Sequence, residues 1–112
     1  MLPPEISPAL RVIGEGTLAL DVEPGQRQSI EPLKLAAALG TPPDCASLAF
    51  LFRWRVDGKS EIRFEGHLQG TTVAVGQGNT GLASVGCMVI EAVNDGDKPI
   101  SGDVRYYVAA AR

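Results

Sequence analysis

The sequence has little of what most function classes need. It contains one histidine, two cysteines and one tryptophan, and aromatic residues make up 5% of its 112 positions. Two cysteines are too few for a disulfide scaffold or a cysteine-rich metal site. So few aromatic rings argue against a surface that stacks on sugars. No Ser-His-Asp or Cys-His spacing surrounds His67, which alternation places on a polar strand face beside Glu65, so we predict a surface histidine and no enzyme.

An excess of positive charge and long apolar runs are also missing. Ten Lys and Arg residues against thirteen Asp and Glu give a formal net charge of −3, and the basic residues are scattered. This surface would repel a phosphate backbone, so we expect no nucleic-acid partner. No apolar run approaches the ~20 residues that span a bilayer, so we expect no membrane partner. Residues 1–5 lack the basic and apolar regions of a secretory signal, although a processed chain would have lost such regions. The localisation therefore stays unknown.

The length and composition fit one globular domain. The chain has 112 residues, of which 45% are apolar and 21% charged, and this is enough for one core and too little for two. We therefore predict a single β domain, residues 1–112. Residues 1–8 contain prolines and are predicted to be an extended N-terminal arm. Residues 108–112 are apolar with little charge, as in an arm that docks on a neighbour.

Apolar residues that recur at every second position indicate strands. The clearest signal lies in residues 48–56, where every even position is large and apolar, and it continues in residues 61–68. We predict that these two segments pair as a two-stranded antiparallel ribbon, since both have one apolar and one charged face. The shared buried face of the ribbon is predicted to contain Phe50, Phe52, Trp54, Ile62 and Phe64.

The length of the loop sets the register of this ribbon. A two-residue turn would place the apolar face of one strand over the charges of the other. A three-residue loop, residues 56–58, instead pairs Phe52 with Ile62. It also sets Arg53 opposite Glu61 as a cross-strand ion pair. We predict the three-residue loop.

Further elements are predicted on both sides of the ribbon. Residues 82–93 are apolar on both faces and are predicted to form one central strand that is covered from both sides. Residues 29–40 fit both a helix and a strand, and we predict one short helix near 30–39. Other strands are predicted at residues 17–22, 71–75 and 104–110. The sequence thus predicts a mainly β fold, a small antiparallel β-sandwich or barrel of about six to eight strands.

One stretch matches a nucleotide-binding pattern. The residues Gly76-Gln-Gly78-Asn-Thr-Gly81 follow an apolar segment, as GxGxxG does in dinucleotide-binding proteins. That motif needs a helix after its last glycine to hold the pyrophosphate. Here Gly86 and β-branched residues follow, so we predict a flexible glycine-rich connection between strands and no cofactor.

Oxygen-bearing side chains gather in a second segment. Asn94, Asp95, Asp97 and Asp103 are candidates for a calcium site, because calcium prefers carboxylate and carbonyl oxygens. Their spacing does not match the twelve-residue helix-loop-helix pattern, and tight turns select the same residue types. We therefore predict no metal site.

The two cysteines occupy different settings. Cys45 lies in a proline-containing stretch that is typical of a loop, whereas Cys87 lies in an apolar run and is predicted to be a small buried residue. One possible pairing proves nothing without geometry, so we predict free thiols rather than a disulfide.

These exclusions favour a domain that acts through its surface. A short β domain leaves strand edges, which are natural pairing sites where they are neither charged nor covered. We predict a non-enzymatic structural or interaction domain with protein partners, a subunit of a homo-oligomer or larger assembly. Such an assembly could be a virion, with the chain as a phage decoration or tail accessory protein. Two alternatives remain: a small-ligand or glycan-binding β module that uses loops 76–81 and 94–97, and an enzyme assembled from residues far apart in the sequence.

Overall fold

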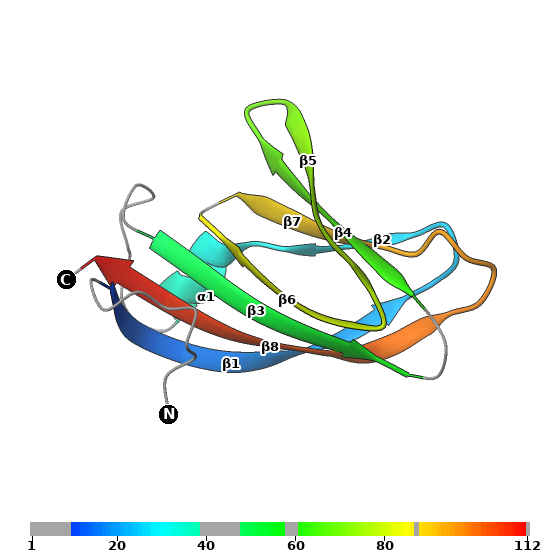
Figure 1. Cartoon of the computed structure of the whole chain (residues 1–112), viewed down its shortest axis with the longest axis horizontal. Helices are drawn as coiled ribbons and strands as arrows, with labels where there is room; N and C mark the ends of the chain where they lie inside the picture. The colour runs from blue at the N-terminus through cyan, green and yellow to red at the C-terminus, as the bar shows by residue number, and fades with distance from the viewer. Residues whose placement is uncertain (1–9, 39–47, 58–60, 87, 112) are drawn as a thin grey trace.

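Eight strands and one short helix make up the part of the chain that the structure describes (Figure 1). This computed structural model describes residues 10–38, 48–57, 61–86 and 88–111. The predicted arm at residues 1–8 and the two cysteines, Cys45 and Cys87, lie outside them. In chain order the elements are β1 (Leu10–Val22), β2 (Arg27–Ile30), α1 (Pro32–Ala38), β3 (Leu48–Val56), β4 (Ile62–Leu68), β5 (Thr71–Gly78), β6 (Thr80–Val85), β7 (Val89–Val93) and β8 (Ile100–Ala111).

The strands form two four-stranded antiparallel sheets. Sheet A has the order β1-β8-β3-β6, and sheet B has the order β2-β7-β4-β5. Apart from the β4–β5 turn, each connection between consecutive strands crosses from one sheet to the other. This is the arrangement of a jelly roll, an eight-stranded double-sheet fold. The predicted β-sandwich is therefore confirmed, and the single short helix α1 lies inside the predicted range 30–39.

The core lies between the two sheets. The five side chains predicted to be buried together are confirmed, since each is at most 3% exposed. They meet across the layers: the ring of Phe64 in sheet B lies 5.2 Å from that of Phe52 and 4.7 Å from that of Trp54 in sheet A, centroid to centroid. The helix α1 adds Leu35 and Ala36 to this core. Among the described residues, no helix is long and apolar enough to cross a membrane.

The predicted ribbon of residues 48–68 is wrong, although both of its strands exist. β3 pairs with β6 and β8 in sheet A, whereas β4 pairs with β5 and β7 in sheet B. The two strands face each other across the core instead of lying side by side. Alternation determines which face of a strand is buried. It does not determine whether two strands lie side by side in one sheet or face each other from two sheets, because both arrangements bury the same side chains.

The predicted register fails for the same reason. Phe52 pairs with residues of β6 and β8 instead of Ile62. Arg53 lies opposite Arg105 rather than Glu61, so the predicted cross-strand ion pair is wrong. The segment that was expected to close a hairpin instead carries the chain from sheet A to sheet B.

Two further predictions fail because segments of the chain change layer or continue a strand. Residues 82–93 are not one central strand: they contribute to β6, an edge strand of sheet A, and to β7, which lies inside sheet B. Residues 108–111 are not an arm, since they form the end of β8 between β1 and β3. Val108 and Ala109 are at most 1% exposed there. An apolar composition with little charge therefore marks the centre of sheet A and not a free end.

A tight turn joins β4 to β5, and it was not identified from the sequence. Its two central residues, Gln69 and Gly70, have φ values of 50° and 80°. Positive φ at both positions is what a type I′ hairpin turn requires, and glycine adopts it without strain. The turn extends away from the body of the sandwich at the top of Figure 1.

Candidate functional site

The first notable surface is the open side of the sandwich, where β5 and β6 lie. β5 is an edge strand of sheet B, and β6 is an edge strand of sheet A. Both belong to a stretch without charge, because no Asp, Glu, Lys or Arg occurs from Leu68 to Ile90. Because each is an edge strand, one side of it presents backbone groups without a sheet partner in the described part of the chain.

An apolar groove lies between these two strands. Its volume is about 470 Å³. Val73 of β5 is 42% exposed and Leu82 of β6 is 38% exposed, so apolar side chains from both strands are open to solvent along the groove. The other aliphatic residues that line the groove include Val75, Val85 and Met88. We call this surface, formed by β5, β6 and the groove, the open edge.

The packing of Trp54 explains the glycine-rich motif beside the open edge. A β-carbon on Gly76 would lie 2.4 Å from the indole ring, and one on Gly81 would lie 2.2 Å from it. The indole Nε1 also donates a hydrogen bond to the carbonyl of Gly78 at 3.3 Å. The motif is thus not a flexible connection, since it forms the end of β5 and the start of β6. Glycines occur there because the backbone approaches a large core ring.

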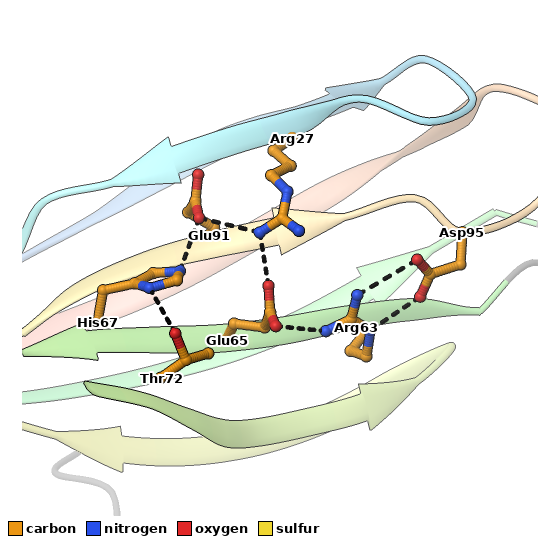
Figure 2. A network of polar contacts seen from close by, with 7 residues as sticks. All are labelled: Arg27, Arg63, Glu65, His67, Thr72, Glu91 and Asp95. Atoms are coloured by element: carbon orange, nitrogen blue, oxygen red, sulfur yellow. Dashed lines mark hydrogen bonds and ion pairs between the residues drawn. The ribbon is translucent and has the colours of Figure 1, made fainter. Parts of the chain in front are cut away.

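The second notable surface is a polar network on the outer face of sheet B (Figure 2). The sheet register places Glu65 of β4 opposite Glu91 of β7, and two like charges in such a pair repel each other. Arg27 of β2 lies between them. Its Nη1 donates to Oε1 of Glu65 at 2.6 Å and to Oε1 of Glu91 at 3.1 Å. The guanidinium group therefore holds three strands together through two carboxylates.

Arg63 extends the network along β4. It donates to Asp95 in a two-pronged contact, from Nε to Oδ2 at 2.8 Å and from Nη2 to Oδ1 at 3.2 Å. Its Nη1 lies 2.7 Å from Oε2 of Glu65. The two carboxylate oxygens of Glu65 are thus held by two different arginines, as Figure 2 shows.

His67 ends the network on the side of β5. It lies on the polar face beside Glu65, as alternation indicates, but its nearest polar partners belong to neighbouring strands. Nδ1 lies 3.2 Å from Oγ1 of Thr72, and Nε2 lies 2.6 Å from Oε1 of Glu91. The side chain is 34% exposed, so the imidazole is half-buried rather than fully solvated.

The arginines lower the pKa of the carboxyl groups that they contact. The pKa of Glu65 lies below its ordinary value chiefly because Arg63 donates to it, and Arg27 adds to this effect. The pKa of Asp95 is lowered mainly by the same Arg63. Both carboxyl groups are therefore held in the charged form by neighbouring guanidinium groups.

This arrangement predicts an acid-sensitive contribution to stability. The folded-state pKa values of Glu65 and Asp95 lie below the ordinary 4.5 and 3.8. The stabilisation is therefore fully present above those values and is lost as the pH falls through the lower folded-state values. We expect Arg63→Gln to have a lower urea midpoint than the unsubstituted chain at neutral pH, and this difference to shrink below about pH 4.

The control for this prediction is Arg53→Gln, which changes an exposed arginine on the opposite sheet. Its effect on the urea midpoint should not decrease as Glu65 and Asp95 become protonated. A difference between Arg63→Gln and the unsubstituted chain that stays constant from neutral to acid pH would contradict the pKa shifts.

Asn94, one of the calcium candidates, has a structural role in the loop after β7. It is 1% exposed. Its Nδ2 donates to the carbonyl of Val22 at 2.9 Å and to the carbonyl of Lys98 at 2.7 Å. Its Oδ1 accepts a hydrogen bond from the N–H of Gly96 at 2.9 Å. The amide therefore ties the β7–β8 loop to the end of β1.

The three aspartates of the same prediction lie in different settings. Asp95 pairs with Arg63, Asp97 is exposed in the loop, and Asp103 lies within β8 opposite Arg55. These three carboxylates do not form a group of metal-ligating atoms within 4.8 Å of one another in the described residues. The structure therefore does not bring the predicted candidates together.

A different group is gathered within that distance. Ligand atoms of Glu65, His67 and Glu91 all lie within 4.8 Å of one another. Alternation in the sequence places Glu65 and His67 on one strand face, but no local pattern links Glu91 to them. Glu91 joins them only because β7 pairs with β4 in this register.

Comparisons with known proteins support the fold alone. No known family model matches the chain, and no curated protein matches it in sequence. The structure is similar to a chain from Bacillus endospore appendages, described as a novel family of disulfide-linked pili, with a TM-score of 0.57 and 9% identity over 99% of this chain and 96% of that one. A second chain comes from a virus-like particle of the extra small virus of the freshwater prawn Macrobrachium rosenbergii. It aligns over 96% of this chain and 84% of that one with 12% identity, and its TM-score of 0.28 is too low to indicate a shared fold. The chain thus shares its β fold with the Bacillus appendage chain.

Proposed function

We propose that this chain is a non-enzymatic structural subunit that assembles with copies of itself through the open edge. The observation that carries this proposal is the difference between the four edge strands of the two sheets. Two of these edges carry charged side chains, which oppose pairing with another strand, and two do not.

The edges formed by β1 and β2 have such features. β1 carries the charged residues Arg11, Glu15 and Asp21, and its pairing with β8 shifts register between Val12 and Gly14. β2 has four residues and begins with Arg27. Charged side chains, bulges and short length are the usual ways in which proteins keep sheet edges from pairing.

The edges formed by β5 and β6 lack charge, although the pairing of β5 with β4 also shifts register, between Phe64 and Glu65. β5 has eight residues and β6 has six, and neither carries a charge. A strand added to either edge would satisfy its backbone N–H and C=O groups. It would also cover Val73 and Leu82, whose exposure is otherwise unfavourable. Pairing at the open edge therefore removes both unpaired backbone groups and exposed apolar surface.

The fold agrees with this proposal by analogy. Jelly rolls occur in viral capsid and lectin domains, and a shared fold does not by itself imply a shared function. The Bacillus chain with a similar fold belongs to pili. A virion subunit, such as a phage decoration or tail accessory protein, is the more specific form of our proposal.

Light scattering coupled to size-exclusion chromatography tests the proposal. We expect the unsubstituted chain to have a mass that is a multiple of the 11.8 kDa chain. The double change Val73→Lys and Leu82→Lys places two charges in the open edge, so it should shift the protein to a monomer without lowering its melting temperature greatly, because both side chains are already exposed.

The matched control is Thr17→Lys, which adds a lysine to an exposed position on the charged edge strand β1 and should leave the mass unchanged. A protein that is monomeric at all accessible concentrations contradicts self-assembly. A double variant that keeps the assembled mass shows that copies meet elsewhere.

A further inference from the structure

We propose that Glu65, His67 and Glu91 form a binding site for a divalent transition-metal ion, of which Zn²⁺ is the probe, on the outer face of sheet B (Figure 2). Its three ligands lie on β4 and β7 rather than on the strands of the open edge, and the site does not depend on the proposed assembly. It would bind the ion through one imidazole nitrogen and two carboxylate oxygens.

The sheet places the three donors in a compact triangle. Glu65 and His67 are two residues apart on β4 and share its outer face, whereas Glu91 lies directly opposite Glu65 on β7. Their ligand atoms all lie within 4.8 Å of one another. Ligands about 2.1 Å from a tetrahedral ion are spaced by about 3.4 Å, so small side-chain movements are enough to bind one. Because β4 and β7 pair in sheet B, the backbone already holds the three donors close together and does not need to move.

The imidazole of His67 gives an independent indication of a cation site. Its Nε2 is buried and has no hydrogen-bond partner among the described residues, although Oε1 of Glu91 lies 2.6 Å away. This contact is close but is not aligned as an N–H···O hydrogen bond. In the tautomer whose ring proton is on Nδ1, the lone pair of Nε2 faces this carboxylate oxygen, and the two repel each other. A metal ion that binds both atoms removes this repulsion and satisfies the nitrogen.

The position already attracts positive charge. Nη1 of Arg27 contacts Oε1 of Glu65 at 2.6 Å and Oε1 of Glu91 at 3.1 Å, the oxygens that an ion would bind. The side chain of Arg27 is 47% exposed, so it can move into solvent when an ion arrives. Arg27 is therefore a competitor of the metal ion, and its removal should strengthen metal binding.

The surrounding groups orient the donors as the outer shell of a metal site does. The hydroxyl of Thr72 lies 3.2 Å from Nδ1 of His67, which leaves Nε2 directed at the carboxylates. Nη1 of Arg63 holds Oε2 of Glu65 at 2.7 Å, which leaves Oε1 for the ion. Hydrogen-bond partners of this kind set the orientation of ligating histidines and carboxylates.

The chemistry of the donors selects the class of ion. An imidazole nitrogen with carboxylate oxygens suits zinc and similar transition metals, whereas calcium and magnesium prefer oxygen donors alone. Three protein ligands leave a fourth position of a tetrahedral ion for water.

Isothermal titration of the full chain with Zn²⁺ at neutral pH tests the proposal. We expect one ion per chain, at least ten-fold weaker binding by His67→Ala and by Glu91→Gln, and at least three-fold tighter binding by Arg27→Ala. Glu61→Gln, which changes an exposed carboxylate just before β4, should bind as the unsubstituted chain does. Ca²⁺ and Mg²⁺ should give no saturable binding.

Two results overturn the proposal. One is the absence of saturable Zn²⁺ binding by the unsubstituted chain up to millimolar concentration. The other is binding that His67→Ala leaves unchanged, because zinc would then be held elsewhere in the chain. Circular dichroism of each variant shows that it is folded, and the gain expected for Arg27→Ala cannot arise from a loss of folding.

Discussion

Replacing Phe64 with alanine should lower the free energy of unfolding by about 3–5 kcal/mol. The side chain is fully buried, and it is the ring of β4 that contacts Phe52 and Trp54 in the opposite sheet. Truncation removes this apolar contact and leaves a cavity, because the rings of sheet A are held by their own strand and collapse only in part. Urea denaturation followed by circular dichroism measures the loss.

The matched control is Leu68→Ala on the same strand. Leu68 is 49% exposed, so we expect a change within about 0.5 kcal/mol. A double-mutant cycle between Phe64→Ala and Phe52→Ala should show a coupling energy of about 0.5–1.5 kcal/mol. Strictly additive effects would contradict the face-to-face packing of β3 and β4.

Replacing Asn94 with alanine should lower the free energy of unfolding by about 2–3 kcal/mol. The amide is 1% exposed, and it makes hydrogen bonds to the carbonyls of Val22 and Lys98 and to the N–H of Gly96. Alanine fulfils none of these and leaves one buried and two part-buried backbone groups without this partner. Thermal or urea denaturation measures this effect.

Two further variants define the role of Asn94. Asp97→Ala, in the same loop but exposed, should change the stability by less than about 0.5 kcal/mol. Asn94→Asp keeps an acceptor for Gly96 but loses both donated hydrogen bonds, so it should destabilise the protein nearly as much as alanine. If Asn94→Ala is as mild as Asp97→Ala, the amide does not hold the loop to β1.

Period-two alternation predicted strands and buried faces well but predicted their partners badly. The strands at residues 48–56 and 62–68 and the burial of Phe50, Phe52 and Trp54 are confirmed. The ribbon built from them is wrong, since the same pattern fits two strands that face each other across a sandwich. Because consecutive strands pair often, the sequence favoured a hairpin, and the repeated crossing between layers left no local signal.

The surfaces of interest were predictable only in part. A strand at residues 71–75 was expected, and the lack of charge from Leu68 to Ile90 can be counted in the sequence. The strand order places β5 and β6 at the sheet edges, and alternation does not predict strand order. The polar network likewise had a local part, Arg63 beside Glu65, and a distant part, Glu91, that no spacing indicated.

By itself the sequence determined a mainly β domain, the position of its clearest strands and the side chains that fill its core. These are local properties, because alternate side chains of a strand point to opposite faces. Only the tertiary structure decided which strands pair, which edges stay open, and that Glu91 meets Glu65 and His67. These features depend on contacts between distant segments, and competing strand pairings bury the same side chains and leave the same pattern in the sequence.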